Sequence, residues 1–321
     1  MHCAGLIFDS SAHYIDHLAP FCALMNWPLI ICEESLAETC RTYYPDLDVR
    51  QIDLFDLQLP SCLVTCDSRP LLQAALGPLS SKILWMPHGQ SDKGWKTPFF
   101  EALAEEDLLL VYGQRMRDVL LAKKISIPQI SIGSFRWLYM QKHKPFYEQL
   151  LAQHFQDRRF TLYAPTWEDR DRNGTLFEAL PALMKTVPTN LLIKLHPNTL
   201  RAFAPQIERL IGLAGPSALF LEEFPPIYPL LSRCDAYIGD MSSIGYDFLH
   251  FQKPLAFLCR QKTDPWQDPS AYLMRFGKQL LLNEISHLFP LQPPDPAALS
   301  HAFDPIDWPE IRKQIEQFVT S

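Results

Sequence analysis

Short apolar runs recur along the chain and alternate with segments whose apolar residues follow a helical period. This alternation is typical of β-α units that build parallel sheets. In the first half, the runs predict strands at 5–8, 29–32, 63–66, 83–86, 108–112 and 130–133. The helical patterns between them cover 13–25, 34–43, 71–76 and 114–122.

A longer helical pattern from 137 to about 155 is rich in Lys, His and Gln and indicates a connector. Beyond it the alternation restarts, and strands are predicted at 160–164, 190–195, 219–222, 236–239, 254–258 and 279–282. Helices are predicted at 176–185, 202–212, 243–251 and 308–318. Two similar α/β halves joined by a connector predict the GT-B plan, in which two Rossmann-like domains face a central cleft.

Composition and charge agree with two globular domains. The chain has 321 residues, of which 47% are hydrophobic and 20% charged, and a length of this order suits two cores. A formal charge of −7 argues against a nucleic-acid partner, because proteins that bind nucleic acid present a basic face. No apolar run approaches the ~18 residues that span a bilayer, and the N-terminus lacks the basic region of a signal peptide. The eight cysteines form no CxxC pair, so we expect reduced thiols in a cytoplasmic protein.

Three short segments carry the candidate chemistry: Pro87-His88-Gly89, Lys194-Leu195-His196-Pro197, and Asp240-Met241-Ser242-Ser243 with the following helical segment. Each follows a predicted strand, where open α/β sheets bind ligands. Two hydroxyls at the start of a helix, together with its free N–H groups, suit an anion such as pyrophosphate. Two histidines and a phosphate site indicate group transfer from an activated phosphate donor.

The histidines have different expected roles. Because Gly89 leaves little backbone bulk, the ring of His88 can project into the cleft as a general base; the alternative is a histidine bonded to a loop carbonyl. His196 would donate to the leaving phosphate, unless it is a buried core residue. Lys194 lies on the same strand face and either adds positive charge or is an ordinary exposed lysine.

The remaining donor-side candidates are polar residues at strand ends. Ser242 and Ser243 would bind phosphate; a simple N-cap is the alternative, and both roles can hold at once. Asp240 would orient a neighbouring group, and Asp247 would either favour the helix dipole or accept from a ribose. Thr166 precedes a polar loop in which Arg170 is a candidate phosphate contact.

Two features invite a metal interpretation that we do not adopt. Asp169-x-Asp171 resembles a DxD motif, but the arginines beside it favour a solvated turn. His13 and His17 are four residues apart, as zinc ligands on a helix are, yet no glutamate lies between them as in HExxH. We therefore expect no metal, and place Ser11 and His13 on the acceptor wall of the cleft; an ordinary exposed helix is the alternative. The aromatic segment 94–100 either contacts a lipid-linked acceptor or membrane surface, or folds over its own domain.

The ordered motifs resemble the CDP-glycerol glycerophosphotransferase family, which includes the teichoic-acid polymerases. The resemblance is carried by Tyr163-Ala164-Pro165-Thr166-Trp167, the Lys194–Pro197 motif, the block from Cys234 to Phe248, Lys253-Pro254, and His88-Gly89 followed by Lys93. Met241 stands where the family has tyrosine. The resemblance implies a GT-B fold and transfer of a phospho-alditol from a CDP-activated donor to a hydroxyl, with release of CMP. It also implies that His88 and His196 lie in the active site.

On this basis we predict an N-terminal acceptor domain at 1–140 and a C-terminal nucleotide-donor domain at 141–307, with helix 308–319 packing back on the first. Lys93 belongs to the acceptor side in this prediction. The acceptor would be a polyol, glycan or lipid-linked molecule, with no tightly bound cofactor and weak contact with the inner face of the membrane. Two alternatives stay open: a glycosyltransferase or nucleotide-sugar epimerase that uses a UDP-sugar, and an inactive nucleotide-binding scaffold.

Overall fold

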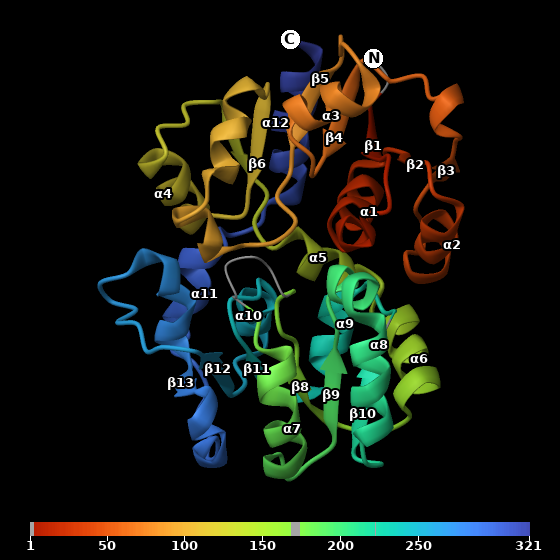
Figure 1. Ribbon diagram of the computed structural model, residues 1–321. Coiled ribbons are helices and arrows are strands. Elements are labelled where there is room, and N and C mark those ends of the chain that lie inside the picture. Colours follow the sequence, from red (N-terminus) through yellow and green to blue (C-terminus); the bar gives the residue numbers. More distant parts are fainter. Residues whose placement is uncertain (1–2, 168–173, 222) are drawn as a thin grey trace. The chain divides into compact units, whose positions relative to one another are not determined.

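The computed structural model describes residues 3–167, 174–221 and 223–321 (Figure 1). The chain divides into two compact units. The N-terminal unit comprises Met1–Gln90, Lys96–Tyr147 and Ser300–Ser321, and the C-terminal unit comprises Ser91–Trp95 and Glu148–Leu299. The short segment 91–95 therefore belongs to the C-terminal unit, although residues of the N-terminal unit flank it on both sides. None of the helices in the described ranges is long and apolar enough to cross a membrane.

The N-terminal unit is built on a parallel sheet of seven strands in the order β3-β2-β1-β4-β5-β6-β7. The strands are β1 (Cys3–Ile7), β2 (Leu29–Ile31), β3 (Val49–Gln51), β4 (Cys62–Thr65), β5 (Lys82–Trp85), β6 (Leu108–Val111) and β7 (Gln129–Ser131). The helices are α1 (Ile15–Met25), α2 (Glu34–Tyr43), α3 (Arg69–Leu76), α4 (Gln114–Ala122), α5 (Phe135–Lys142) and α12 (Trp308–Thr320). The strand order reverses between β1 and β4, so the topological switch point lies there.

The C-terminal unit repeats this plan with six parallel strands in the order β10-β9-β8-β11-β12-β13. The strands are β8 (Phe160–Tyr163), β9 (Leu191–Lys194), β10 (Ala218–Leu221), β11 (Cys234–Gly239), β12 (Leu255–Cys259) and β13 (Lys278–Leu281). The helices are α7 (Leu176–Thr186), α8 (Pro197–Leu213), α9 (Ile227–Ser232) and α10 (Ile244–Phe248). Two further helices cross the division of the chain: α6 (Lys144–Phe155) and α11 (Ala297–Ala302). Here the switch point lies between β8 and β11.

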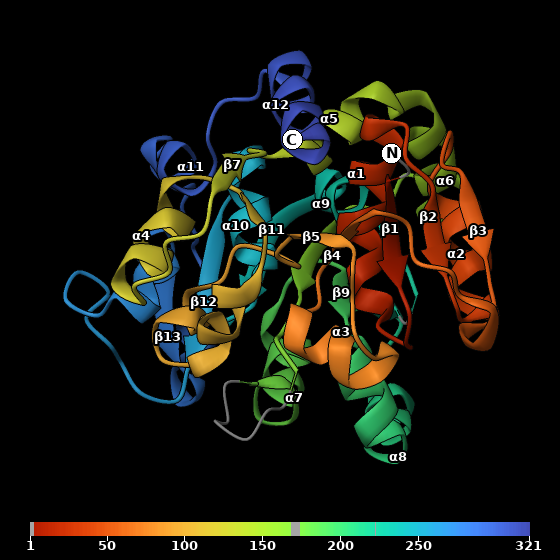
Figure 2. The same cartoon turned by 90° about the horizontal axis from the view of Figure 1, so that it is seen from above.

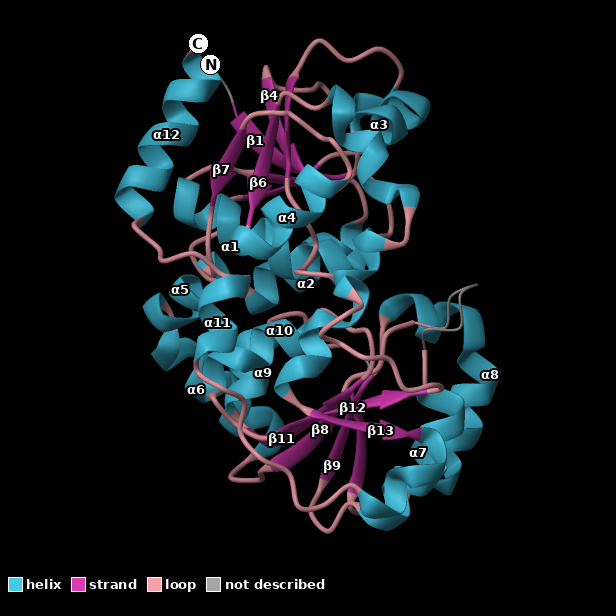
Figure 3. Cartoon of the chain, turned by 90° about the vertical axis from the view of Figure 1, so that its left-hand side faces the viewer, coloured by secondary structure: helices cyan, strands magenta, loops and turns pink. Residues whose placement is uncertain are grey.

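Helices cover both faces of each sheet (Figure 3), so the inner strands are buried on both sides. This explains why they are continuous apolar runs and not alternating ones. All four residues of β8 and of β4, for example, are buried. The last helix, α12, returns to the N-terminal unit (Figure 2), where the Trp308 Nε1–H donates to the Leu24 carbonyl of α1 across 3.2 Å.

The predicted fold class of two Rossmann-like domains is confirmed, and all twelve predicted strands are present. The prediction missed β3 because Val49-Arg50-Gln51 is a polar, largely exposed edge strand. The single helix predicted from 137 to 155 is wrong, since the structure has α5 and α6 separated at His143. Pro145 has no N–H for the carbonyl of residue 141, which interrupts the helical hydrogen bonds at this point. Helix α8 begins at Pro197 and not at 202, and α9 and α11 were not predicted.

Candidate functional site

Three strand ends gather polar residues at the switch point of the N-terminal unit. The loop after β1 leads through Ser11 into a 3₁₀ helix, η1 (Ala12–Tyr14), and Asp67 follows β4. His88 follows the neighbouring strand, β5. Since the carboxyl ends of parallel strands meet at one edge of a sheet, these loops lie next to one another.

His88 is exposed, and its ring lies against two aromatic rings of η1. Its centroid is 5.2 Å from that of His13, edge-on, and 5.4 Å from that of Tyr14. The structure thus brings together His88 and His13, which the sequence assigned separately to catalysis and to the acceptor side. Ser11 is half-buried, and its N–H donates to Asp9 Oδ1 across 3.0 Å.

The backbone around His88 is fixed on both sides. The Tyr112 hydroxyl donates to the Pro87 carbonyl across 3.1 Å and lies 2.8 Å from His17 Nδ1. Because a carbonyl can only accept, the hydroxyl proton is directed to Pro87, and His17 donates from Nδ1. On the other side Gly89 has φ +127°, a conformation that side chains with a Cβ rarely adopt. The loop geometry is therefore set by residues that do not themselves face the solvent.

His17 is a buried part of this support. Burial is the main cause that lowers its pKa well below 6.5, and the positive charge of Arg136 adds to it. His17 is therefore neutral, and its Nδ1 is occupied by the Tyr112 hydroxyl. Within the described ranges, no group of three or more His, Cys, Asp and Glu side chains is arranged to hold a metal ion.

A second supporting contact joins Tyr14 to Asp67. The Tyr14 hydroxyl donates to Asp67 Oδ1 across 3.0 Å, and Asp67 is only 3% exposed. Burial raises the pKa of Asp67 to about 6 and also raises the pKa of Tyr14. Neither residue was predicted from the sequence, although Asp67, like His88, is a polar residue that comes shortly after an apolar strand.

Asp240 organises the switch point of the C-terminal unit. Its Oδ1 accepts from the Thr166 N–H at 2.8 Å and from the Ser242 N–H at 3.2 Å, and its Oδ2 accepts from the Thr175 hydroxyl at 3.0 Å. Burial raises its pKa to about 6, and these hydrogen bonds oppose that rise. The carboxylate therefore ties the loop after β8 to the loop after β11.

The two serines after β11 differ in their surroundings. Ser242 is buried and hydrogen-bonded with the Tyr237 hydroxyl, whereas Ser243 is half-buried. Ser243 precedes α10 but makes no side-chain cap bond, so the N-cap alternative does not account for its hydroxyl. Asp247 is 2% exposed and accepts from the Tyr228 hydroxyl across 3.0 Å, which places it in the interior of the unit.

His196 precedes α8 and is half-buried, with its Nδ1 accepting from the Asn198 N–H across 3.1 Å. In a neutral ring the proton must then lie on Nε2, which leaves an N–H donor on the other edge of the ring. The Trp167 ring centroid is 6.5 Å away. Lys194 ends β9 two residues earlier and is half-buried.

The placement of Lys93 corrects the sequence prediction. Lys93 was assigned to the acceptor side, but it belongs to the C-terminal unit, where its Nζ donates to Thr166 Oγ1 across 2.7 Å. A lysine this far from the unit in sequence could not be assigned to it by pattern. Arg170, together with Asp169 and Asp171, lies outside the described residues.

The aromatic segment 94–100 divides between the two units after residue 95. Phe99 and Phe100 pack on the buried Trp85, each with a centroid distance of 6.1 Å. Phe100 is buried, while Phe99 remains 44% exposed. This part of the segment therefore folds over its own domain.

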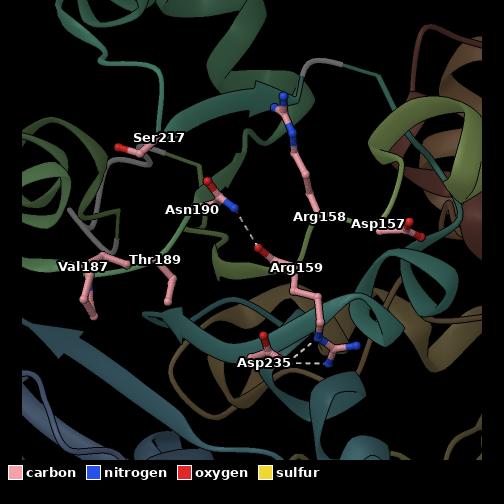
Figure 4. Close-up of a pocket in the computed structure, with 9 residues that line it drawn as sticks. Asp157, Arg158, Arg159, Val187, Thr189, Asn190, Ser217 and Asp235 are labelled. Atoms are coloured by element: carbon pink, nitrogen blue, oxygen red, sulfur yellow. Dashed lines mark hydrogen bonds and ion pairs between the residues drawn. The ribbon is translucent and has the colours of Figure 1, made fainter.

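A cavity of about 580 Å³ lies elsewhere on the C-terminal unit (Figure 4). It is lined by residues that precede or begin the strands, including the ion pair of Arg159 with Asp235 and the amide of Asn190, which donates to the Arg159 carbonyl. The cavity is thus at the amino ends of the strands, opposite the edge that holds Asp240 and His196, and we do not assign it to the candidate site.

Two doubly wound domains with their polar residues at the carboxyl ends of the strands define the GT-B class. Residues 151–269 match the family model of CDP-glycerol:poly(glycerophosphate) glycerophosphotransferase. The resemblance seen in the sequence is thereby confirmed over this segment. No curated protein sequence matches the chain significantly.

Solved structures support the fold. The wall teichoic acid polymerase TagF is similar with a TM-score of 0.65 and 14% identity, over 99% of this chain and 88% of that one. A UDP-GlcNAc 2-epimerase from Methanocaldococcus jannaschii, bound to UDP-GlcNAc and UDP, has a TM-score of 0.66 and 12% identity over 100% and 99% of the two chains. MnaA from S. aureus, bound to UDP, has a TM-score of 0.64 and 13% identity over 100% and 96%.

Proposed function

We propose that the chain transfers a glycerophosphate, or a similar phospho-alditol, from a CDP-activated donor to a hydroxyl of a cell-envelope or polysaccharide acceptor and releases CMP. The observation that carries this proposal is the overlap of the family match with the geometry. The matched residues 151–269 include both the Asp240 cluster and His196.

In the proposed reaction His88 takes the proton of the acceptor hydroxyl, and the oxygen attacks the phosphorus that bears the alditol. A new P–O bond forms while the phosphoanhydride bond breaks, and its electron pair leaves with CMP. Phosphoryl transfer depends mainly on positioning and charge stabilisation. The contacts that fix the backbone on both sides of His88 provide the positioning.

In this proposal, residues of the C-terminal unit stabilise the charge on the leaving phosphate. His196 donates from Nε2 to the leaving phosphate, because its Nδ1 is already held by the Asn198 N–H. Ser243 and Ser242 contribute at the loop that Asp240 organises. Lys194 and Arg170 remain candidate phosphate contacts. The scheme uses no tightly bound cofactor.

The test is titration with CDP-glycerol, CMP, CDP, UDP and UDP-GlcNAc, followed by an assay of CMP release with candidate polyol and glycan acceptors. We expect selective cytidine binding. His88→Ala should lose CMP release but keep donor affinity, whereas His196→Ala should lose both. His154→Ala is the matched control, since His154 is an exposed residue of α6.

Other results would favour the alternatives. Selective uridine binding would indicate a UDP-sugar enzyme, and binding without turnover would indicate a scaffold. CMP release that survives His88→Ala would overturn the role of His88. We also propose that the protein acts in the cytoplasm and contacts the membrane peripherally. If Phe99→Ala pellets with liposomes as the wild type does, the Phe99 side chain does not contribute to this contact.

A further inference from the structure

The carboxylate of Asp67 is buried at the switch point of the N-terminal unit without a counter-charge. Asp67 is 3% exposed and follows β4. Its Oδ1 accepts from the Tyr14 hydroxyl across 3.0 Å. Within the described ranges no Lys, Arg or His side chain pairs with it, and Asp9, which also acts on it, is negative. A buried charge without a partner is costly, so a cation that forms nearby would be stabilised.

Asp67 keeps its charge at neutral pH in spite of this burial. Burial raises its pKa to about 6, and the hydrogen bond from Tyr14 opposes the rise. The side chain is therefore mainly a carboxylate at neutral pH. The adjacent thiol of Cys66 is neutral, because burial raises its pKa well above 9.0. Loss of the Tyr14 hydrogen bond would raise the pKa of Asp67 further and leave less of the carboxylate form.

Tyr14 connects this carboxylate to the exposed His88. The hydroxyl of Tyr14 is bonded to Asp67, and its ring centroid lies 5.4 Å from that of His88, with 42° between the ring planes. All three residues belong to the N-terminal unit. A cation within about 6 Å of an aromatic centroid is attracted to the ring. A protonated His88 would therefore interact with Tyr14 directly and with the charge of Asp67 beyond it.

We propose that Asp67, acting through Tyr14, positions His88 and stabilises the imidazolium that forms when His88 takes the proton of the acceptor hydroxyl. The proton stays on His88 in this step; Asp67 contributes its charge and takes no proton. Asp67 is thus a positioning residue, since the group that it bonds is Tyr14. The inference rests on the proposed function for the identity of the base.

The other titratable and charged groups around the proposed base do not supply this negative charge. His13 lies edge-on to its ring, with centroids 5.2 Å apart. His17 is buried and neutral. The positive charge of Arg136 acts on His17 and is paired with Asp16 across 2.8 Å. Asp67 is therefore the buried carboxylate whose charge is not already paired with a cation.

The experiment measures the pKa of His88 by NMR titration of its ring Cε1–H signal, which is identified by its loss in His88→Ala. Asp67→Asn keeps an oxygen for the Tyr14 hydroxyl and removes the charge. Tyr14→Phe keeps the ring and removes the hydrogen bond that favours the carboxylate form of Asp67. We expect each variant to lower the pKa of His88 by roughly 0.5–1.

Tyr228→Phe is the matched control. The Tyr228 hydroxyl donates to the buried Asp247 across the same 3.0 Å, but in the C-terminal unit. The control should lose a similar amount of stability and leave the pKa of His88 at the wild-type value. A wild-type pKa of His88 in Asp67→Asn would overturn the inference, and so would an equal shift in Tyr228→Phe. If Asp67→Asn does not fold, Tyr14→Phe decides by the same criterion.

The pH profile of CMP release separates this inference from the proposed function. In Asp67→Asn the acidic limb of kcat/KM should move to lower pH, and the plateau should fall roughly 3- to 10-fold at unchanged donor affinity. If His88→Ala abolishes CMP release but Asp67→Asn keeps the wild-type profile, the function stands and the inference is wrong. If the wild-type protein releases no CMP, the CDP-alditol function is wrong, and the pKa of His88 still decides whether Asp67 stabilises its protonated form.

Discussion

The hydroxyl of Tyr112 donates a hydrogen bond to the carbonyl of Pro87, the residue directly before His88. It also accepts from His17, so two buried polar groups depend on it. The fully buried Tyr112 thus holds the loop that carries the exposed His88. This makes the placement of His88 testable without changing His88.

Tyr112→Phe removes the hydroxyl and keeps the ring. It leaves the Pro87 carbonyl and the His17 N–H without their partner, and an unsatisfied buried group costs about 1–3 kcal/mol of unfolding free energy. We expect lower stability by that order in urea titration and a reduced rate of CMP release. Donor affinity should stay at the wild-type value; a parallel loss of donor affinity would contradict a role confined to His88.

Gly89→Ala tests the backbone on the other side of His88. At φ +127° an added Cβ is strained, at a cost of about 1–3 kcal/mol. We expect lower stability and a lower rate of CMP release. Gly212→Ala is the control: Gly212 lies in α8, and a Cβ there meets nothing within 4 Å. That change should stabilise by about 0.5–1 kcal/mol, so similar effects at both positions would refute the backbone argument.

Substitution can separate the roles of the two ring nitrogens of His196. Asn in its place can still accept from the Asn198 N–H, because asparagine is a favoured N-cap, but it has no donor at the Nε2 position. We expect His196→Asn to keep the stability within about 0.5 kcal/mol and to lose CMP release, whereas His196→Ala should also lose about 1 kcal/mol of cap energy. Equal activity of His196→Asn and wild type, measured by CMP formation, would remove the Nε2–H from the mechanism.

The sequence predicted the parts of the site that follow from local pattern. Apolar runs that are buried on both faces are recognisable without any partner, and a polar residue just after such a run marks the carboxyl end of a strand. The positions of His88, His196 and Asp240 just beyond the ends of strands were predicted in this way. The parallel order of the strands then places these ends at one edge of each sheet.

Contacts between residues far apart in sequence could not be predicted. The Tyr14–Asp67 hydrogen bond depends on the pairing of β1 with β4, and the Lys93–Thr166 contact depends on a loop that joins the other unit. Neither leaves a periodic signal. The sequence predictions were therefore better for individual residues at strand ends than for the side chains that hold them.

Asp240 gives a prediction about pH. Burial raises its pKa in the folded protein to about 6, compared with about 3.9 for an unperturbed aspartate. Between these values the folded protein binds more protons at this site than the unfolded chain does. The contribution of Asp240 therefore makes the unfolding free energy fall as the pH rises from about 4 to about 6, by at most about 3 kcal/mol.

Asp240→Asn removes this contribution and keeps an oxygen for the Thr166 and Ser242 N–H groups. Its new amide can donate to Thr175, whose hydroxyl lies 3.0 Å from Asp240 Oδ2 and 3.0 Å from the Tyr163 hydroxyl. The stability of the variant relative to wild type should therefore rise between pH 4 and pH 6, as measured by urea unfolding at each pH. Gly212→Ala, which changes no titratable group, should give a difference that is independent of pH. If the difference in unfolding free energy between Asp240→Asn and wild type does not change with pH, burial does not oppose ionisation of the Asp240 carboxylate. Its positioning role, which depends on that burial, would then be wrong.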